Sequence, residues 1–330
     1  MVQIAVLGAS GHTGRFVVDE LHRRGLGVIR AVRPGSSPTT DETRTIAFDH
    51  PDSLDEALRG AAAVINCAGP FFDTSEPAAA AAIRARIPYL DITAEQVTAL
   101  RLFERFDAQA RSVGVTFVPA MAFYGGLADL LASALVREGE AVDTIRVAVA
   151  LDGWQPTAGT RLTGERNHYQ RLMVRDGQLA PLDVAPESRR WNFPEPFGQQ
   201  QVVPLALAEV VLMHRHLHVG EQISFMNETP LADLRDPSTP APTATDERGR
   251  SAQQFVMDVE VRVGAEVRRA TASGQDIYAI TAPLVVSACL ELLGNPALPT
   301  GVRSPGELFD PIAFLKSLAP DLATTFSVEV

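Results

Sequence analysis

Short apolar runs alternate with amphipathic segments through the first 120 or so residues. The run 2–8 is apolar at almost every position, which is typical of a strand buried on both faces. Segment 13–25 then places Phe16, Val17 and Leu21 at helical spacing. The same reasoning predicts further strands at 27–33, 43–49, 62–69, 88–93 and 115–120, and helices at 53–60, 75–87 and 95–114. This alternation predicts a parallel sheet with helices on both faces.

Local signals indicate where three helices begin. Ser53, followed three residues later by Glu56, has the pattern of a capping box. Pro77 is expected in the first turn of its helix. Thr281 is expected to cap a helix that runs over 281–294.

The pattern changes after a predicted linking helix at 125–139. Segments 143–151 and 254–274 alternate apolar and polar residues, and a hairpin turn is expected at Gly264 and Ala265. These are signals of antiparallel strands. Residues 230–250 are rich in Pro and Thr and predict a long surface loop, either a plain connection or a lid.

Together these patterns predict an α/β protein with a doubly wound parallel sheet at its N-terminus. A second, α+β domain is expected on a largely antiparallel sheet. The expected boundaries are 1–124 for the first domain and 125–282 for the second, with C-terminal helices over 283–330 packing back on the first. A chain of 330 residues is long enough for two domains.

The turn after the first predicted strand reads GASGHTG. Gly8 would permit the sharp turn, Gly11 would let main-chain N–H groups approach a pyrophosphate, and Gly14 would let the helix lie close to the strand. The N-terminus of that helix offers unpaired N–H donors to phosphates. Three neighbouring side chains add further donors: Ser10, His12 and Thr13. The turn therefore predicts a dinucleotide site, with a purely structural turn as the alternative.

The end of the second predicted strand indicates which dinucleotide is bound. An NAD site has Asp or Glu there, whereas this chain has Arg33, followed by Ser36 and Ser37. A guanidinium and nearby hydroxyl groups suit the 2′-phosphate of NADP(H). A carboxylate at Asp49, which closes the third predicted strand, is placed to reach the adenine amino group. The cofactor expected from these residues is NADP(H).

A Gly-Pro break follows the fourth predicted strand. Ligands of such sheets bind beyond the carboxyl ends of the strands. The break therefore fits a main-chain wall along the cofactor ribose, although a simple strand terminator is the alternative. Four residues form this expected wall: Ala68, Gly69, Pro70 and Phe71.

Five motifs in this order resemble those of the saccharopine dehydrogenase-like NADP-binding oxidoreductases: GASGHTG, VINCAGPF, YLDITAE, FYGGLADLLA and GQDIYAITAPL. The resemblance is best in the first 135 residues and around 270–293. It implies a Rossmann domain, a second α/β domain that carries substrate contacts and often a dimer interface, and hydride transfer with a nicotinamide. The family's reactions include the reduction of imines made from amino acids and aldehydes, and related members reduce enoyl or other double bonds. Ala94 stands where the family pattern usually has Gly.

The composition of the chain limits the classes of partner that it is expected to bind. The net charge is −11 and no basic block occurs, which argues against nucleic acid and anionic membranes. No uninterrupted run of about 18 apolar residues and no leader are seen, and the two cysteines, Cys67 and Cys289, lie far apart. We therefore expect a cytoplasmic protein without a metal site, acting on a small molecule and forming a homo-oligomer, a dimer.

Hydride transfer needs a proton donor, and Lys316 is the only lysine. Asp91 and Glu95 follow the fifth predicted strand, where each is placed either to hold an ammonium group or relay a proton, or to cap a helix. Tyr124 follows the sixth, as a donor or as a packing aromatic, and Tyr169 is a further candidate. No tyrosine is followed four residues later by lysine, which excludes the short-chain dehydrogenase pair.

Segment 157–171 offers groups that suit a substrate anion. Hydroxyl and guanidinium donors come from Thr160, Arg161, Thr163 and Arg166. A polar loop with solvated arginines is the alternative. A second polar run places His214, His216 and His218 two apart, but no Cys or carboxylate completes a metal site within it, so a half-exposed strand is expected.

Two functions fit these observations. The first is an NADP(H)-dependent oxidoreductase that transfers a hydride to or from a C=N, C=O or activated C=C bond of a small metabolite. It requires a closed polar pocket near residues 91, 124 and 160. The second is a catalytically idle NADP(H)-binding regulator, which would leave the nicotinamide face open and carry a large apolar patch elsewhere.

Overall fold

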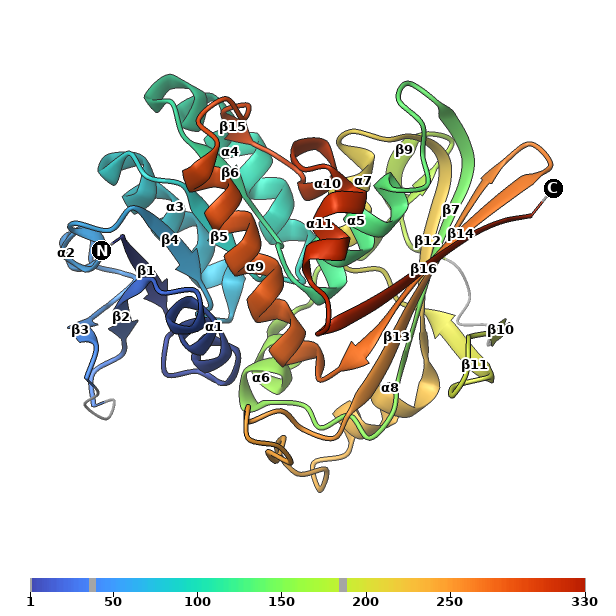
Figure 1. The fold of residues 1–330 in the computed structure, drawn as a ribbon, viewed down its shortest axis with the longest axis horizontal. Coiled ribbons are helices and arrows are strands. Elements are labelled where there is room, and N and C mark those ends of the chain that lie inside the picture. Colours follow the sequence, from blue (N-terminus) through green and yellow to red (C-terminus); the bar gives the residue numbers. More distant parts are fainter. Residues whose placement is uncertain (1, 36–39, 184–188, 330) are drawn as a thin grey trace.

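The structure, a computed structural model, describes residues 2–35, 40–183 and 189–329. Two lobes lie side by side, each built on one sheet (Figure 1). In the described residues, sheet A has seven parallel strands in the order β15-β6-β5-β4-β1-β2-β3. These strands are β1 (Gln3–Leu7), β2 (Gly27–Val32), β3 (Glu42–Thr45), β4 (Ala63–Asn66), β5 (Tyr89–Asp91), β6 (Thr116–Val118) and β15 (Gly301–Val302).

Helices cover both faces of sheet A because its central strands are apolar on both sides, whereas the edge strand β3 is polar. In β1, Ile4 and Val6 join one core while Ala5 and Leu7 join another. The first core lies under α1 (His12–Arg23) and α9 (Ile277–Gly294). The second lies under α2 (Pro51–Leu58), α3 (Phe71–Ala85) and α4 (Gln96–Val113). The chain thus goes to opposite faces after β1 and β4, which are neighbours, and this is the switch point where such sheets bind ligands.

Sheet B of the second lobe has nine strands in the described residues. Seven follow the order β10-β11-β12-β7-β13-β14-β16, and β8 pairs with β12 and β9. The β12–β7 pair is parallel and the other pairs are antiparallel. The strands are β7 (Ala141–Leu151), β8 (Leu172–Arg175), β9 (Gln178–Pro181), β10 (Arg189–Asn192), β11 (Gln199–Pro204), β12 (His218–Asn227), β13 (Gln254–Val263), β14 (Glu266–Gln275) and β16 (Leu322–Glu329).

The expected fold class is confirmed by these two sheets. The predicted hairpin is also confirmed, since Val263 of β13 pairs with Glu266 of β14 across a turn at Gly264 and Ala265. The predicted linking helix is shorter than expected. It consists of a single π-helical turn, η1 (Phe123–Leu127), followed by α5 (Ala128–Ser133).

The C-terminal stretch divides its contacts between the lobes. Helix α9 packs on α1, and β15 extends sheet A beside β6. By contrast, α10 (Pro305–Leu308) and α11 (Pro311–Ser317) pack on α5, and β16 pairs with β14 in sheet B. Figure 1 shows α9 running between the lobes and β16 lying along the second sheet. Strand β15 was not expected from the sequence.

Three predicted helix starts are wrong. Helix α2 begins at Pro51, and Ser53 accepts a hydrogen bond from the Ala47 N–H instead of capping the helix. Helix α3 begins at Phe71, so that Pro77 lies inside it. Helix α9 begins one turn earlier than predicted, at Ile277, because Asp276 caps it, while the Thr281 hydroxyl donates to the Ile277 carbonyl within the helix.

Two other local predictions also need correction. Residues 230–250 are not all loop, because α8 (Glu228–Arg235) takes up their first part. The histidine run is not a strand: His214 ends α7 (Ala208–His214), His216 lies in the turn that follows, and His218 begins β12. The three side chains therefore do not share one strand face.

One helix is long and apolar enough to cross a membrane. Helix α9 has a mean hydropathy of 1.8 over its 18 residues, and no other helix in the described residues passes the same test. Within the fold, 72% of α9 is buried. Since its side chains join the core shared by both sheets, we interpret it as a core helix.

Candidate functional site

Main-chain atoms lie so close to the glycine turn after β1 that side chains at positions 8 and 14 would not fit. Gly8 has φ +74°, and a Cβ there would lie 2.9 Å from the Ala68 Cα atom in the loop after β4. A Cβ at Gly14 would overlap with the Gly8 carbonyl oxygen. The turn therefore brings α1 against β1 and sets the 67–70 loop directly beside it, as the predicted roles of Gly8 and Gly14 require.

The N-terminus of α1 fits an anion such as a pyrophosphate. Gly11 is its N-cap and has no side chain to cap the helix, and the first turn has no acidic residue. Ser10 is exposed, and Thr13 is half-buried. The His12 Nε2 atom is buried without a partner among the described residues, and burial lowers the pKa of His12, so the ring is neutral at pH 7. The residues present thus fit a dinucleotide at this turn.

Glu95 shapes the loop between β4 and α3. Its carboxylate is 2% exposed and accepts hydrogen bonds from the Phe71 N–H (3.2 Å), the Phe72 N–H (2.9 Å) and the Thr98 hydroxyl (2.7 Å). Burial raises the pKa of Glu95, and these three donors partly offset that effect. The carboxylate therefore caps the first turn of α3 and holds the loop that contains Gly69 and Pro70.

Asp91 holds the loop after β6 in the way that Glu95 holds the loop after β4. It is fully buried, and its carboxylate accepts hydrogen bonds from the Ala120 N–H (2.8 Å), the Thr93 N–H (3.1 Å) and the Tyr89 hydroxyl (2.9 Å). Burial raises the pKa of Asp91, and these donors act against it. With its oxygens bonded inside the protein, Asp91 is placed to position the loop after β6, which agrees with the capping role that the sequence left open beside a role toward the substrate.

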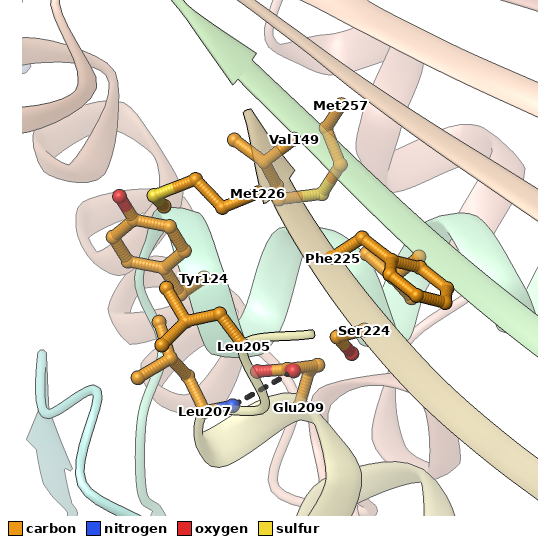
Figure 2. A pocket seen from close by; sticks show the side chains of 10 residues that line it. Tyr124, Val149, Leu205, Leu207, Glu209, Ser224, Phe225, Met226 and Met257 are labelled. Atoms are coloured by element: carbon orange, nitrogen blue, oxygen red, sulfur yellow. Dashed lines mark hydrogen bonds between the residues drawn. The ribbon is translucent and has the colours of Figure 1, made fainter. Parts of the chain in front are cut away.

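Tyr124 stands at the mouth of a pocket between the two lobes. The pocket is lined by this tyrosine, by the loop before α7 and by one face of sheet B. Figure 2 shows the Tyr124 ring facing Leu205 and Met226. The Ala208 N–H donates to the Ala94 carbonyl (3.1 Å), which places the loop before α7 on the carboxyl edge of sheet A. Of the three positions at which we expected a pocket, residue 124 lines it, whereas residues 91 and 160 do not.

Tyr278 joins the glycine turn to the second lobe. Its ring packs edge-on against His12, with centroids 5.1 Å apart. Its hydroxyl lies 3.0 Å from the Thr160 hydroxyl and accepts from the Thr157 N–H (3.3 Å), at the start of α6 (Ala158–Arg166). Sequence reasoning missed this residue as a site residue, although it lies in the motif GQDIYAITAPL that carries the family resemblance.

Helix α6 lies over the loop after β4. The Thr163 hydroxyl is 3.8 Å from where a Cβ at Gly69 would lie. Arg166 forms an ion pair with Asp73 (2.7 Å) and stacks on the Phe72 ring. The Thr160 hydroxyl thus lies beside Tyr278 and the Thr163 hydroxyl near Gly69, while Arg166 connects α6 to α3.

Two predicted site residues are engaged elsewhere. The Arg161 guanidinium donates to three main-chain carbonyls, of Leu234 (2.7 Å), Asp236 (3.1 Å) and Thr239 (2.9 Å), and so holds the segment after α8. Tyr169 is 46% exposed, and its hydroxyl accepts from Arg101 (3.3 Å). The structure does not bring these two side chains together with Tyr124.

The adenosine end of the expected site is only partly described. Arg33 is exposed just beyond β2, and Ser36 and Ser37 lie outside the described residues. Asp49 lies beyond the end of β3, in the turn before α2, with its side chain 82% exposed. Arg30 of β2 was not singled out from the sequence. Its guanidinium donates to the Ala9 carbonyl of the glycine turn (3.3 Å) and so helps to hold the turn in place.

Neither cysteine is an activated thiol, since burial raises the pKa of both Cys67 and Cys289. Within the described parts of the chain, no group of three His, Cys, Asp or Glu side chains is arranged to hold a metal ion.

Comparison with known proteins points to one family. Residues 4–118 match the family model described as the saccharopine dehydrogenase NADP binding domain. Saccharopine dehydrogenase-like oxidoreductases of Bos taurus and Homo sapiens are each 28% identical over 152 residues, which is 38% of this chain and 35% of theirs. A probable mitochondrial saccharopine dehydrogenase-like oxidoreductase of Arabidopsis thaliana is 28% identical over 142 residues, 36% of this chain and 31% of that one. The matches thus span about a third of the relatives' length.

Solved structures extend the likeness of fold to both lobes. Apo saccharopine dehydrogenase (L-Glu forming) from Saccharomyces cerevisiae superposes with a TM-score of 0.67 at 12% identity, over 99% of this chain and 100% of that chain. A meso-dapdh mutant with DAP from Clostridium tetani gives 0.54 at 11% identity, over 97% of both chains. At these identities the likeness is one of fold. The chain therefore has the fold of saccharopine dehydrogenase, and its residues 4–118 match the model of that family's NADP-binding domain.

Proposed function

We propose that this protein is an NADP(H)-dependent oxidoreductase that transfers a hydride to or from a C=N, C=O or activated C=C bond of a small metabolite. The observation that carries the proposal is the glycine turn. It excludes side chains at positions 8 and 14 and leaves the N-terminus of α1 uncapped. The family match over residues 4–118 supports the same cofactor.

The cofactor would be held by the chain's own amides and one guanidinium. The N–H groups at the start of α1 would bind its pyrophosphate, with His12 and Thr13 beside them. Arg33 would neutralise the 2′-phosphate. The 68–71 wall, fixed by Glu95, would lie along the ribose. When bound, the nicotinamide supplies or accepts the hydride.

Tyr124 is the proton donor in this proposal. It is half-buried at the pocket mouth, in the loop that Asp91 holds. Burial raises the pKa of Tyr124, and Tyr278 and Glu209 act in the same direction, so the hydroxyl keeps its proton at pH 7. Reduction of a polar double bond needs a proton donor. Because its raised pKa makes the Tyr124 hydroxyl a weak acid, it would donate only to a strongly basic atom, such as one that gains negative charge on hydride transfer.

The test is NADPH oxidation by the purified protein against panels of imines, ketones and enoyl compounds. Turnover with one class is expected, and Tyr124→Phe should lower kcat by roughly 100-fold or more while NADPH still binds. Tyr169→Phe, an exposed tyrosine outside the pocket, should retain wild-type kcat. Tight NADPH binding without oxidation by any class would favour the idle regulator instead.

The remaining parts of the proposal concern the whole protein. We propose a cytoplasmic homodimer whose substrate is a small molecule and whose partners include neither nucleic acid nor membrane. The domain limits 1–124, 125–282 and 283–330 belong to the same proposal. Light scattering after gel filtration tests the dimer, for which a mass of about twice 35.5 kDa is expected.

A further inference from the structure

Helix α6 is held in place by polar contacts and not by apolar packing. None of its nine residues is buried, and Leu162 is 41% exposed. A helix of this length is marginal in water by itself, and most helices in proteins are stabilised by burying an apolar face. The polar contacts of α6 must therefore keep it both folded and in position.

These contacts connect α6 to both lobes. In the second lobe, the Arg161 guanidinium donates to main-chain carbonyls at the end of α8 and beyond it. On the first lobe, Arg166 pairs with Asp73 of α3, but both side chains are nearly half exposed, and exposed ion pairs contribute little. The Thr163 hydroxyl lies near Gly69, in the loop beside the glycine turn. Helix α6 therefore lies next to the loop that is expected to line the cofactor.

Tyr278 connects α6 to the glycine turn through a chain of contacts. Its hydroxyl lies 3.0 Å from the Thr160 hydroxyl, which lies 2.9 Å from the hydroxyl of Thr157, the N-cap of α6. The Tyr278 ring packs against His12, the first residue of α1. Asp276 accepts from the Tyr278 N–H (2.9 Å) and so fixes this tyrosine at the start of α9. One side chain thus joins the N-terminus of α1 to the N-terminus of α6.

His12 is the part of this chain of contacts that would respond to a bound pyrophosphate. Its ring packs against those of Phe16 and Tyr278, and its Nε2 atom has no hydrogen-bond partner among the described residues. The N–H groups of the same turn are those expected to bind the phosphates. An anion bound there would restrict the movement of His12 and, through the Tyr278 ring, that of Thr160.

We propose that Tyr278 is a positioning residue that holds α6 as a lid over the bound cofactor. Cofactor contacts with the first turn of α1 stabilise the arrangement in which the Tyr278 hydroxyl bonds to Thr160 and α6 lies against the 67–70 loop. By linkage, closure of α6 strengthens cofactor binding by the same factor. Without the cofactor, α6 opens more readily. This inference rests on the proposed oxidoreductase function, because it takes the glycine turn to be the cofactor site.

Hydrogen–deuterium exchange of the full-length protein, with and without saturating NADP⁺, tests the lid. The amides of residues 161–167 are bonded within α6, so their exchange reports its opening. NADP⁺ should slow this exchange at least about tenfold in the wild type, and should also slow that of residues 8–14. Tyr278→Phe keeps the ring but lacks the hydroxyl. In this variant, NADP⁺ should slow exchange at residues 161–167 by about twofold or less.

A double-mutant cycle on cofactor affinity tests the contact itself. Tyr278→Phe and Thr160→Val should each raise the Kd for NADP⁺ roughly 3- to 10-fold, and the double variant should raise it little more than either one alone. Tyr169→Phe is the matched control, because this tyrosine follows α6 but bonds to Arg101, and it should change neither the Kd nor the exchange. Melting temperatures show that all variants are folded.

The possible failures separate this inference from the proposed function. Slowed exchange at residues 8–14 without any change at residues 161–167 would overturn the lid and leave the cofactor site intact. Equal slowing in the wild type and in Tyr278→Phe, or independent effects of the two variants on the Kd, would overturn the role of Tyr278. Absence of any NADP⁺ or NADPH binding would contradict the oxidoreductase function, and this inference with it.

Discussion

At the scale of single residues, the missing side chain at position 14 is the most restrictive feature of the cofactor turn. A methyl group there would overlap with the Gly8 carbonyl oxygen, which is main chain and has little freedom to move. Gly14→Ala should therefore push α1 away from β1 and raise the Kd for NADPH at least about tenfold. Fluorescence titration measures this. Gly294→Ala, where a Cβ would meet open space, is the control and should bind like the wild type.

Arg33 carries a second prediction at this scale, on cofactor choice. Arg33→Asp removes a charge-assisted contact to the 2′-phosphate and introduces an acceptor for a ribose hydroxyl. The Kd for NADPH should rise roughly 10- to 100-fold while NADH binding is largely spared. Arg59→Asp, at an arginine that is 75% exposed beyond α2, controls for net charge. Equal loss of both cofactors would contradict the assignment of Arg33.

The glycine turn was predictable from sequence, whereas the roles of the two carboxylates were not. Turn, strand and helix signals for residues 8–14 all lie within about 25 residues of one another. The partners of Asp91 and Glu95 are amides 23–29 residues away, at Phe71, Phe72 and Ala120. Which amide faces which carboxylate depends on the order of strands in the sheet. Sequence could place both carboxylates at the carboxyl edge but could not show that they face inward.

At the scale of elements, one partly buried histidine, His216, joins three helical segments. The His216 ring, after α7, lies 2.7 Å from Asp129 of α5, and the same carboxylate accepts from the Gly306 N–H of α10 (2.7 Å). Burial lowers the pKa of His216, but the charge and hydrogen bond of Asp129 outweigh it, so the pKa is raised above its ordinary value of 6.5. The contact thus connects elements that are far apart in the chain.

This contact predicts a specific pH dependence of stability. Because the folded pKa of His216 is raised, its contribution is complete below the unfolded value of 6.5 and is lost as pH rises through the folded pKa. His216→Gln keeps a donor but no charge. The free energy of unfolding should therefore be larger for the wild type than for this variant. This difference should be about 1–3 kcal/mol greater at pH 6 than at pH 9. Urea unfolding at both pH values measures the difference. The exposed His168→Gln should show none, and a pH-independent difference for His216→Gln would refute the ion pair.

Whether a segment forms a helix or a strand was easier to predict than the residue at which that element begins. The start of α3 was misplaced because Glu95, a residue from another loop, caps it in place of a local signal. Asp276 supplies the cap of α9 from a position with φ +59°, which the apolar pattern of the helix does not reveal. The two-residue strand β15 is held by β6 and by Asp107 of α4, and no local pattern marks it.

At the scale of the whole molecule, one apolar core runs from sheet A to sheet B. It includes Val6 of β1, Val17 of α1, Val285 of α9 and Val259 of β13. The first 124 residues alone lack α9 and β15, so the face of sheet A that α1 and α9 cover together would lose part of its cover. We expect a 1–124 fragment to show no cooperative thermal transition by circular dichroism, whereas the full chain shows one. Cooperative melting of the fragment near the temperature of the full chain would contradict this.

The path of the chain between the two sheets limits how the lobes can move. The chain passes from one sheet to the other after β6, returns through α9 to β15, and leaves again for β16. The chain therefore crosses between the two lobes three times, and these three connections restrict a wide hinge opening. The partly exposed side chains at the pocket are Tyr124, Leu205 and Leu207. We therefore expect access to Tyr124 to depend on local movement of these side chains and their loops, and not on a wide separation of the two lobes.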